Sequence, residues 1–250
     1  MVSQSVEQWE RLRAEGAVLL DGFHPVKHAL RFGATVPVVV TPDRAAVLSL
    51  AAALAPDLVT ALDERATEVD AATFDRLSGH RTGVAALAQP AAWTLGSVAQ
   101  AAPLVFLDDP RHLGNYGAVV RVAAGLGAAG VVSTGTVDPW HPAVVRGAAG
   151  LQFALPVLRV PSVDAVPGPL VALDAAGRDA RGFALPDGAV LAFGSERRGL
   201  SPQVRARADE LLALPMRPGV ASYNLASAVA MVLYQWLLGA APPAQPVGQA

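Results

Sequence analysis

The chain contains no cysteine among its 250 residues. Disulfide bonds, thiolate metal sites and a thiol nucleophile are therefore excluded. Lysine is nearly absent too, because Lys27 is the single example and every other Lys/Arg-type cation is an arginine. The formal net charge of −2 counts against a general nucleic-acid binder, which is usually basic. An anion site in this chain would have to be built from a few clustered arginines, whose planar guanidinium suits phosphate.

Long apolar runs are also scarce. The single stretch that resembles a membrane span, residues 223–240, is short for a bilayer and carries Asn224, Ser227 and Gln235, so we expect a buried helix there. Residues 1–13 are polar and lack the apolar core of a signal peptide. With 52% hydrophobic and 16% charged residues, the composition is that of a folded globular chain. We expect a soluble, cytoplasmic protein with no membrane partner.

Two blocks of alternating strand-like and helix-like patterns follow one another, separated by a segment without charge. We expect a first domain over residues 1–90, a linker over 91–102, a second domain over 103–240 and a flexible tail over 241–250. In the first domain the predicted strands are 17–20, 37–41, 58–62 and 83–88, and the predicted helices are 25–32, 43–55 and 70–77.

The second block alternates more regularly. Its predicted strands are 104–107, 130–133, 156–160, 170–173, 190–193 and 210–214, and its predicted helices are 116–126, 142–149, 202–208 and 223–238. Consecutive apolar residues in strands that alternate with helices indicate a parallel sheet covered on both faces. Both blocks are therefore α/β, and ligands are expected at the carboxyl ends of the strands.

A glycine motif in the second block suggests a dinucleotide site that its context does not support. Gly125, Gly127 and Gly130 have G-x-G-x-x-G spacing, but a helix precedes them and a strand follows, which is the reverse of the required order. We expect these glycines to end a helix and to allow close packing against the next strand.

Three segments carry polar residues that the bulk pattern does not explain. In "DDPRHLGNYGAVVRVAAGLGA" (108–128), Asn115 lies near a helix start, and Arg121 is the only charge in an apolar run. A buried arginine is costly unless it is paired, so Arg121 should have either a ligand anion or a carboxylate partner such as Glu196.

In "LAFGSERRGLSP" (191–202), a strand leads into Gly194 and Glu196, with Gly199 as the expected left-handed residue of a turn. Taken alone, this segment is an ordinary charged turn. In "LPMRPGVASYNLASAVAMVLYQW" (214–236), either Ser222 or Asn224 starts a long apolar helix. Ser222 suits the N-cap, and Asn224 is a polar residue beside an apolar face.

In this order and spacing, the three segments resemble the SPOUT superfamily, and within it the SpoU/TrmH branch of RNA 2′-O-ribose methyltransferases. "TVDPWHPAVVRGAAGLQFALPV" (136–157) adds a fourth match. The resemblance implies a parallel-sheet domain with a C-terminal trefoil knot, preceded by a small α/β, ribosomal-protein-like RNA-binding domain. It also implies a homodimer that packs through the helices flanking the knot. The chain departs from the family pattern in a loop lengthened by "RHLG" (111–114) and in a tyrosine at position 223.

The resemblance assigns roles to particular residues of this chain. Catalysis and active-site structure fall to Asn115, Arg121, Glu196, Ser222 and Asn224, and S-adenosylmethionine binding falls to Gly194, Leu214, Met216 and Tyr223. No metal is needed, and the sequence offers no ligand cluster for one. The implied reaction is S-adenosylmethionine-dependent methylation of a ribose 2′-hydroxyl in structured RNA, with rRNA favoured over tRNA.

A cationic stripe in the first domain is a candidate RNA contact. His24, Lys27, His28 and Arg31 recur at i, i+3, i+4 and i+7, which places them on one face of a helix. Arg146 is a further candidate, although a solvated surface stripe explains the pattern equally well. Two other functions stay open: a catalytically silent RNA-binding protein of the same fold, and a nucleotide-dependent oxidoreductase, which the reversed glycine motif disfavours.

Overall fold

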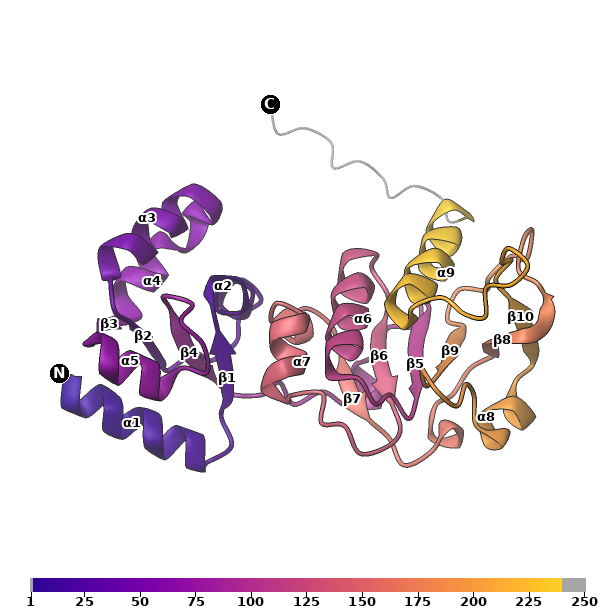
Figure 1. Ribbon diagram of the computed structural model, residues 1–250, viewed down its shortest axis with the longest axis horizontal. Coiled ribbons are helices and arrows are strands. Elements are labelled where there is room, and N and C mark those ends of the chain that lie inside the picture. The colour runs from indigo at the N-terminus through magenta and orange to yellow at the C-terminus, as the bar shows by residue number, and fades with distance from the viewer. Residues whose placement is uncertain (1, 240–250) are drawn as a thin grey trace.

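The computed structural model of the protein describes residues 2–239. Residues 1 and 240–250 lie outside that range, and with them lies the predicted C-terminal tail. The described chain forms two sheets, one from each of the predicted blocks, and Figure 1 shows the blocks next to each other along the long axis of the molecule. None of the helices in this range is long and apolar enough to cross a membrane.

The first sheet has four strands in the order β1-β4-β2-β3. β4 pairs antiparallel with β1 and β2, whereas β2 and β3 are parallel. The strands are β1 (Val18–Asp21), β2 (Val38–Thr41), β3 (Ala66–Glu68) and β4 (Ala85–Ala88). The helices are α1 (Val2–Ala14), α2 (Phe23–Arg31), α3 (Arg44–Leu54), α4 (Val59–Arg65) and α5 (Ala71–Leu77), with a 3-10 turn, η1, at Pro56–Leu58.

The predicted strand over residues 58–62 is wrong, because these residues belong to η1 and α4. Leu58 and Leu62 are both buried and are spaced by one helical turn, so they share the face that packs into the core. A short apolar run of this kind cannot be assigned to strand or helix from its residue types alone. The third strand of the sheet is β3, and the polar N-terminal residues form α1, which buries Trp9 and Leu12.

The second sheet has six strands, all parallel, in the order β10-β8-β9-β5-β6-β7. This confirms the predicted parallel sheet. The strands are β5 (Leu104–Asp108), β6 (Gly130–Ser133), β7 (Val157–Arg159), β8 (Leu170–Asp179), β9 (Val190–Gly194) and β10 (Glu210–Ala213). The helices are α6 (Leu113–Gly125), α7 (Pro142–Gly147), α8 (Pro202–Arg207) and α9 (Leu225–Gly239), with 3-10 turns η2 (Leu95–Ser97), η3 (Leu151–Phe153) and η4 (Val163–Ala165).

Both faces of the second sheet are buried, which explains its continuous apolar strands. Val105 and Leu107 of β5 pack on one side in a core with α6, α7 and α9, whereas Leu104 and Phe106 pack on the other side with α8 and η4. Successive side chains of a strand point to opposite faces, so each of the positions 104–107 of β5 needs an apolar residue.

The glycines at 125, 127 and 130 have the local roles expected of them. α6 ends at Gly125, and Gly127 adopts a φ of 72°. A Cβ on Gly130 would lie 2.8 Å from the carbonyl oxygen of Pro156, so a larger residue would push β6 away from the segment leading into β7. Close packing of the chain accounts for this motif without a dinucleotide.

The two blocks are in direct contact. Nδ1 of His28 on α2 lies 2.7 Å from the carbonyl oxygen of Ala149, and the indole N–H of Trp93 donates to the carbonyl of Gln152 at 3.0 Å. Val145 and Phe153 of the second block are buried in the core of the first. These contacts hold α2 beside η3, and α7 packs against β1. In Figure 1, α7 is the helix of the second block that lies next to the first block.

Candidate functional site

Loops that follow three strands of the second sheet meet at its carboxyl edge. A buried carboxylate, Asp108 at the end of β5, organises this edge. Its Oδ2 accepts the backbone N–H of Ser201 at 2.6 Å, and Thr134 after β6 donates its hydroxyl to Oδ1 at 3.4 Å. Asp108 therefore ties the loop after β9 to the ends of β5 and β6.

A hydrogen-bonded chain of three predicted site residues lies at this edge. Nδ2 of Asn115 donates to Oε1 of Glu196 at 2.8 Å, and Nδ2 of Asn224 donates to Oδ1 of Asn115 at 3.1 Å. The three residues come from the first turn of α6, the loop after β9 and the segment before α9. They lie 81 and 109 residues apart in sequence, so only the tertiary fold brings them together.

Asn224 also begins α9, which corrects the expected role of Ser222 as the N-cap. Oδ1 of Asn224 accepts the backbone N–H groups of Ala226 and Ser227, at 2.9 and 3.4 Å, and α9 starts at Leu225. An asparagine at this place satisfies free N–H groups as well as a serine does. Both functional groups of the Asn224 amide are thus engaged, and Ser222 is exposed on the wall of the neighbouring cavity.

The start of α6 differs from the sequence prediction in a similar way. The helix begins at Leu113, with His112 as the N-cap, whose Nδ1 accepts the N–H of Asn115 at 3.2 Å. Leu113 and Gly114 therefore belong to the helix, and the lengthened loop reduces to Arg111 and His112. A histidine is a rare cap, which is why the pattern placed the helix start later.

Glu196 is held in its ionised form by its neighbours. Burial on its own raises the pKa of this carboxyl, but hydrogen bonds from Nδ2 of Asn115 and from the backbone N–H groups of Glu196 and Arg111 lower it, and the nearby His112 lowers it further. The net result is a pKa below the ordinary value for glutamate. At neutral pH the carboxylate can therefore orient the Asn115 amide.

The loop that carries Glu196 is a closed turn. Ser195 and Gly199 exchange two backbone hydrogen bonds of 3.1 and 2.9 Å, and Gly199 adopts the predicted left-handed φ of 66°. A Cβ on Gly194 would collide with the backbone of Gly199 and Leu200. The close return of the loop past Gly194 therefore requires a residue without a side chain at this position.

An ion pair between Arg205 and Asp174 supports the end of this turn at Leu200. Arg205 of α8 pairs with the buried carboxylate of Asp174 at 2.5 Å, and its Nε donates to the carbonyl of Leu200 at 3.4 Å. The sequence reading missed Asp174, Arg205 and Asp108 as supporting residues. An acid at the end of an apolar strand, as in Asp108, is the signal that could have identified one of them.

Beside the Asn115–Glu196 pair lies a cavity of about 430 Å³. Leu173, Phe193, Leu225 and Ala228 give it apolar walls, and the backbone of residues 194–196 adds polar groups. Of the predicted cofactor residues, Gly194 and Tyr223 line it. Leu214 and Met216 are half-buried in the segment after β10 and are not among the residues that line the cavity. The hydroxyl of Tyr223 donates to the carbonyl of Pro215 at 2.8 Å, which closes that segment on itself.

The prediction that Arg121 is buried is wrong. Its side chain is exposed, and within residues 2–239 it makes neither a hydrogen bond nor an ion pair, with Glu196 or any other group. Arg121 lies on the outward face of α6 between Ala118 and Gly125. These small residues made the segment resemble a buried helix in the sequence, although they lie at the surface. Arg121 lies about 9 Å along the helix from Asn115 and about a third of a turn around it.

Arg121 instead faces the first block, where its charge lowers the pKa of His24 and of Lys27. Burial is the largest cause of both shifts, and the mutual repulsion of these cations adds to it. The predicted cationic stripe on α2 and Arg121 of α6 therefore belong to one electrostatic neighbourhood.

Two members of the stripe are engaged within the chain. Arg31 pairs with Asp57 through two hydrogen bonds of 3.1 and 2.6 Å, and His28 is bound to Ala149 at the contact between the blocks. Burial is also the main reason that the pKa of His28 is lowered. Arg146, the remaining candidate, lies 2.5 Å from Nε2 of His80, whose Nδ1 is 2.6 Å from the buried carboxylate of Asp21.

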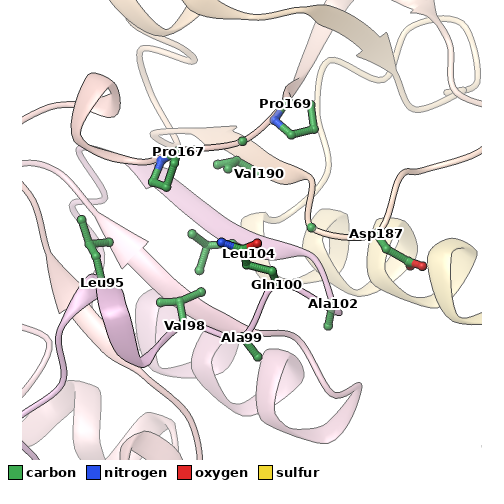
Figure 2. Close-up of a pocket in the computed structure, with 12 residues that line it drawn as sticks. Leu95, Val98, Ala99, Gln100, Ala102, Leu104, Pro167, Pro169, Asp187 and Val190 are labelled. Atoms are coloured by element: carbon green, nitrogen blue, oxygen red, sulfur yellow. The ribbon is translucent and has the colours of Figure 1, made fainter.

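A second cavity, of about 400 Å³, lies at the opposite edge of the same sheet. Figure 2 shows it between the linker and the amino ends of β5, β8 and β9, with Leu95, Val98, Leu104 and Val190 around it. Its polar side chains are Gln100 and Asp187, and Asp187 already accepts the indole N–H of Trp236 at 3.0 Å. No converging set of polar groups appears among these lining residues.

Comparisons with known proteins give a consistent set of similarities. The sequence profile of the SpoU rRNA Methylase family matches residues 102–234. A 23S rRNA (uridine(2479)-2′-O)-methyltransferase of Streptomyces viridochromogenes is 33% identical over 145 residues, which are 52% of this chain and 50% of that protein. The chain thus spans about half the length of that relative. A 23S rRNA (guanosine(2553)-2′-O)-methyltransferase of Bacillus subtilis is 26% identical over 93% of this chain and 95% of its own length.

A solved structure resembles nearly the whole chain. It is the SpoU methyltransferase AviRb from Streptomyces viridochromogenes in complex with the cofactor AdoMet, with a TM-score of 0.78 and 26% identity. The match covers 94% of this chain and 97% of that one, so both sheets are included.

Proposed function

The chain belongs to the SpoU rRNA Methylase family, and we propose that it methylates the 2′-hydroxyl of a ribose in ribosomal RNA, using S-adenosylmethionine. The observation that carries this proposal is the Glu196–Asn115–Asn224 chain of hydrogen bonds on the wall of the 430 Å³ cavity. The names of the Streptomyces and Bacillus relatives favour rRNA over tRNA as the substrate. A cytoplasmic location is part of the same proposal.

The residues present suit an adenosyl ligand. The cavity falls in the size range of small-molecule sites. Leu173, Phe193 and Leu225 offer an apolar surface to a base, and the loop 194–196 offers backbone groups that can read its polar edge. We assign S-adenosylmethionine to this cavity, with Gly194 and Tyr223 in its wall and with Leu214 and Met216 supporting the adjoining segment.

S-adenosylmethionine brings an activated methyl group on a positively charged sulfur. The protein then has to position the ribose and to hold the groups around its hydroxyl in place. Glu196 and Asn224 fix the Asn115 amide from both sides, and one N–H of its NH₂ group stays free for a substrate oxygen. Ser222, exposed on the same wall, can add a hydroxyl to this set.

Arg121 is assigned to the RNA backbone. An arginine is a poor base near neutral pH, because its pKa lies above about 12. Its exposed position next to Lys27 and His24 suits contact with a phosphate close to the target ribose. With Arg146 and the α2 stripe, it extends the proposed RNA surface from the second block to the first.

We propose that residues 1–90 are the RNA-binding domain, that 91–102 link it to the catalytic domain, and that residues 103–240 form the latter. A trefoil knot in that domain is supported by the path of the chain. β10 is the outermost strand on one side of the sheet. Asn224 lies in the segment that follows β10, yet it donates a hydrogen bond to Asn115, which lies after β5, a more central strand. The segment 214–224 must cross β8 and β9 to do so, beside the closed turn 195–199.

A homodimer through the helices flanking the knot is part of the same proposal. Met231, Tyr234 and Leu238 are exposed on α9 at spacings of three and four residues, so they form one apolar stripe. Contiguous apolar surface on a helix is a common feature of contacts with another chain.

The test is a methyl-transfer assay with labelled S-adenosylmethionine and protein-free rRNA, followed by mapping of the methylated position. We expect label on a ribose 2′-oxygen, together with measurable S-adenosylmethionine binding in a calorimeter. A protein that binds rRNA but neither binds the cofactor nor transfers label would be the catalytically silent alternative. Label on a base instead of a ribose would also overturn the proposal.

A further inference from the structure

A third cavity shares part of its wall with the proposed cofactor cavity. It measures about 490 Å³ and is lined by Arg111 and His112 on one side, by Arg197 and Arg198 on another, and by the Asn115–Glu196 pair with Ser195 between them. We call it the arginine cavity. Asn115, Ser195 and Glu196 line both cavities, so the pair assigned to ribose positioning separates them.

The arginine cavity is rich in positive charge. Its lining includes three arginines, Arg111, Arg197 and Arg198, and a single carboxylate, Glu196, which is already bound to Asn115. Arg111 pairs with Asp109 through its Nε at 3.0 Å. Arg197 and Arg198 are exposed, and within residues 2–239 neither has a hydrogen bond or an ion pair. Their charges are therefore available to an anion from outside.

The two free arginines are carried by a rigid support. The turn between Ser195 and Gly199 is closed by its two backbone hydrogen bonds, is anchored to Asp108 through Ser201, and is braced by Arg205. Glu196 bends inward from this turn to Asn115. Little backbone freedom is lost when a ligand binds to groups held in this way, which favours binding.

We propose that the arginine cavity binds a backbone phosphate of the RNA strand next to the ribose that is methylated. This inference rests on the proposed function and extends it by naming what holds the target nucleotide. In RNA each ribose is bonded directly to its flanking phosphates. A phosphate bound in the arginine cavity, on the other side of the Asn115–Glu196 pair, would therefore determine which ribose of the strand lies against that pair. Arginine forks suit phosphate oxygens, and here two of them stand at adjacent positions.

The carboxylate of S-adenosylmethionine is the other anion that could lie near this pair. The neighbouring cavity already offers the cofactor a site of suitable size with apolar walls. We therefore assign the RNA phosphate, and not the cofactor carboxylate, to the arginine cavity. If the cavity binds an RNA phosphate, loss of its arginines should weaken rRNA binding. If it binds the cofactor carboxylate, their loss should weaken S-adenosylmethionine binding instead.

The test compares Arg197→Gln/Arg198→Gln with the wild type and with Arg178→Gln/Arg181→Gln. Arg178 and Arg181 are exposed arginines of the same block that pair with Glu210 and Asp179, so this control removes the same number of positive charges away from the cavity. Binding of protein-free rRNA is measured at several salt concentrations. Because the cavity is proposed to hold one phosphate of a single strand, loss of that contact should lower the slope of log K against log salt by about 0.7. We expect at least a tenfold rise in KM for RNA, with unchanged calorimetric affinity for S-adenosylmethionine.

A double variant with the wild-type salt slope would overturn the inference, as would a loss of S-adenosylmethionine affinity with intact RNA binding. Arg197→Lys/Arg198→Lys adds a second check: it should keep most of the slope but bind more weakly, since the charge stays and the fork is lost. A wild-type protein that binds rRNA and transfers no methyl group would refute the proposed function instead, so the two failures can be told apart.

Discussion

The two edges of the six-stranded sheet carry cavities of similar size and different chemistry. The cavity at the carboxyl edge measures about 430 Å³, and the one at the amino edge about 400 Å³. At the carboxyl edge, side chains from three distant segments are hydrogen-bonded to one another. At the amino edge, Gln100 and Asp187 stand in a largely apolar lining. Volume alone therefore does not identify a site, whereas convergence of polar groups does.

The direction of the strands explains this difference. In a parallel sheet all carboxyl ends meet at one edge, and helices that follow the strands begin there with free N–H groups. α6 starts at that edge beside Asn115, and α9 starts there beside Asn224. At the other edge the chain enters the strands through the linker and through proline-containing loops such as 167–169. Those segments close the sheet and present few polar side chains.

Asn115→Ala tests the comparison most directly, with Gln100→Ala in the opposite cavity as its control. Removing the Asn115 amide leaves Glu196 and Asn224 without their common partner and misplaces the ribose. We expect methyl transfer to fall by at least ~10²-fold, as is usual when a positioning group at a reacting centre is lost. Gln100→Ala should retain wild-type turnover. Equal losses in the two variants would show that the amino edge also takes part in the reaction.

Gly194→Ala asks whether the shape of the carboxyl edge matters as much as its polar groups. The new Cβ would meet the backbone of Gly199 and Leu200, so the turn that carries Glu196 has to move. We expect S-adenosylmethionine affinity, measured by calorimetry, to fall at least tenfold, and the protein to melt at a lower temperature. Gly125→Ala is the matched control, because nothing lies within 4 Å of its Cβ and the site is the last turn of α6. Wild-type affinity in Gly194→Ala would mean that the turn is not part of the cofactor site.

The sequence predicted the second block well, for a physical reason. Most of its strands are short apolar runs that are buried on both faces, and Gly130–Ser133 matches to the residue. The exception is β8, predicted over 170–173, which continues to Asp179 through polar, partly exposed residues. The first block was predicted less well. Its segment 58–62 fits a strand and a helix equally well by residue type, and it is helical in the structure. Local pattern decides an element only when its length and period are unambiguous.

The site could be predicted only in part. Asn115, Glu196 and Asn224 were identified by motif, and the structure joins them. Their supports were missed, since nothing in the sequence relates Asp108 to Ser201 across 93 residues. Arg121 was misjudged because alanine and glycine look the same in a pattern whether they face the core or solvent.

Asp108→Asn tests the buried support of the carboxyl edge. The carboxylate accepts the Ser201 N–H at 2.6 Å, and an amide in its place either loses that charge-assisted bond or turns its NH₂ toward the donor. We expect a loss of about 1–3 kcal/mol in the free energy of unfolding, the usual range for a buried hydrogen bond that is broken. In thermal melts this corresponds to a shift of roughly 2–4 °C per kcal/mol for a chain of this size. Asp187→Asn, at the amino edge, should change the melting temperature less, because its bond to Trp236 is exposed.

The smallest expected effect is a pH dependence confined to the carboxyl edge. Burial pushes the pKa of Glu196 up, but hydrogen bonds from Asn115 and the backbone hold it below its ordinary value. A carboxyl with a lower pKa in the folded state stabilises the fold above its unfolded pKa, and that stabilisation is lost as the pH falls through the folded value. Between about pH 5 and about pH 3 the wild type should therefore lose more stability than Glu196→Gln, measured by urea titration at each pH. Glu196 is only partly withdrawn from solvent, and solvent screening therefore keeps the difference small. Gln100→Ala, which removes no titrating group, should follow the wild-type curve; identical curves for all three proteins would show that the hydrogen bond from Asn115 does not hold Glu196 in its ionised form.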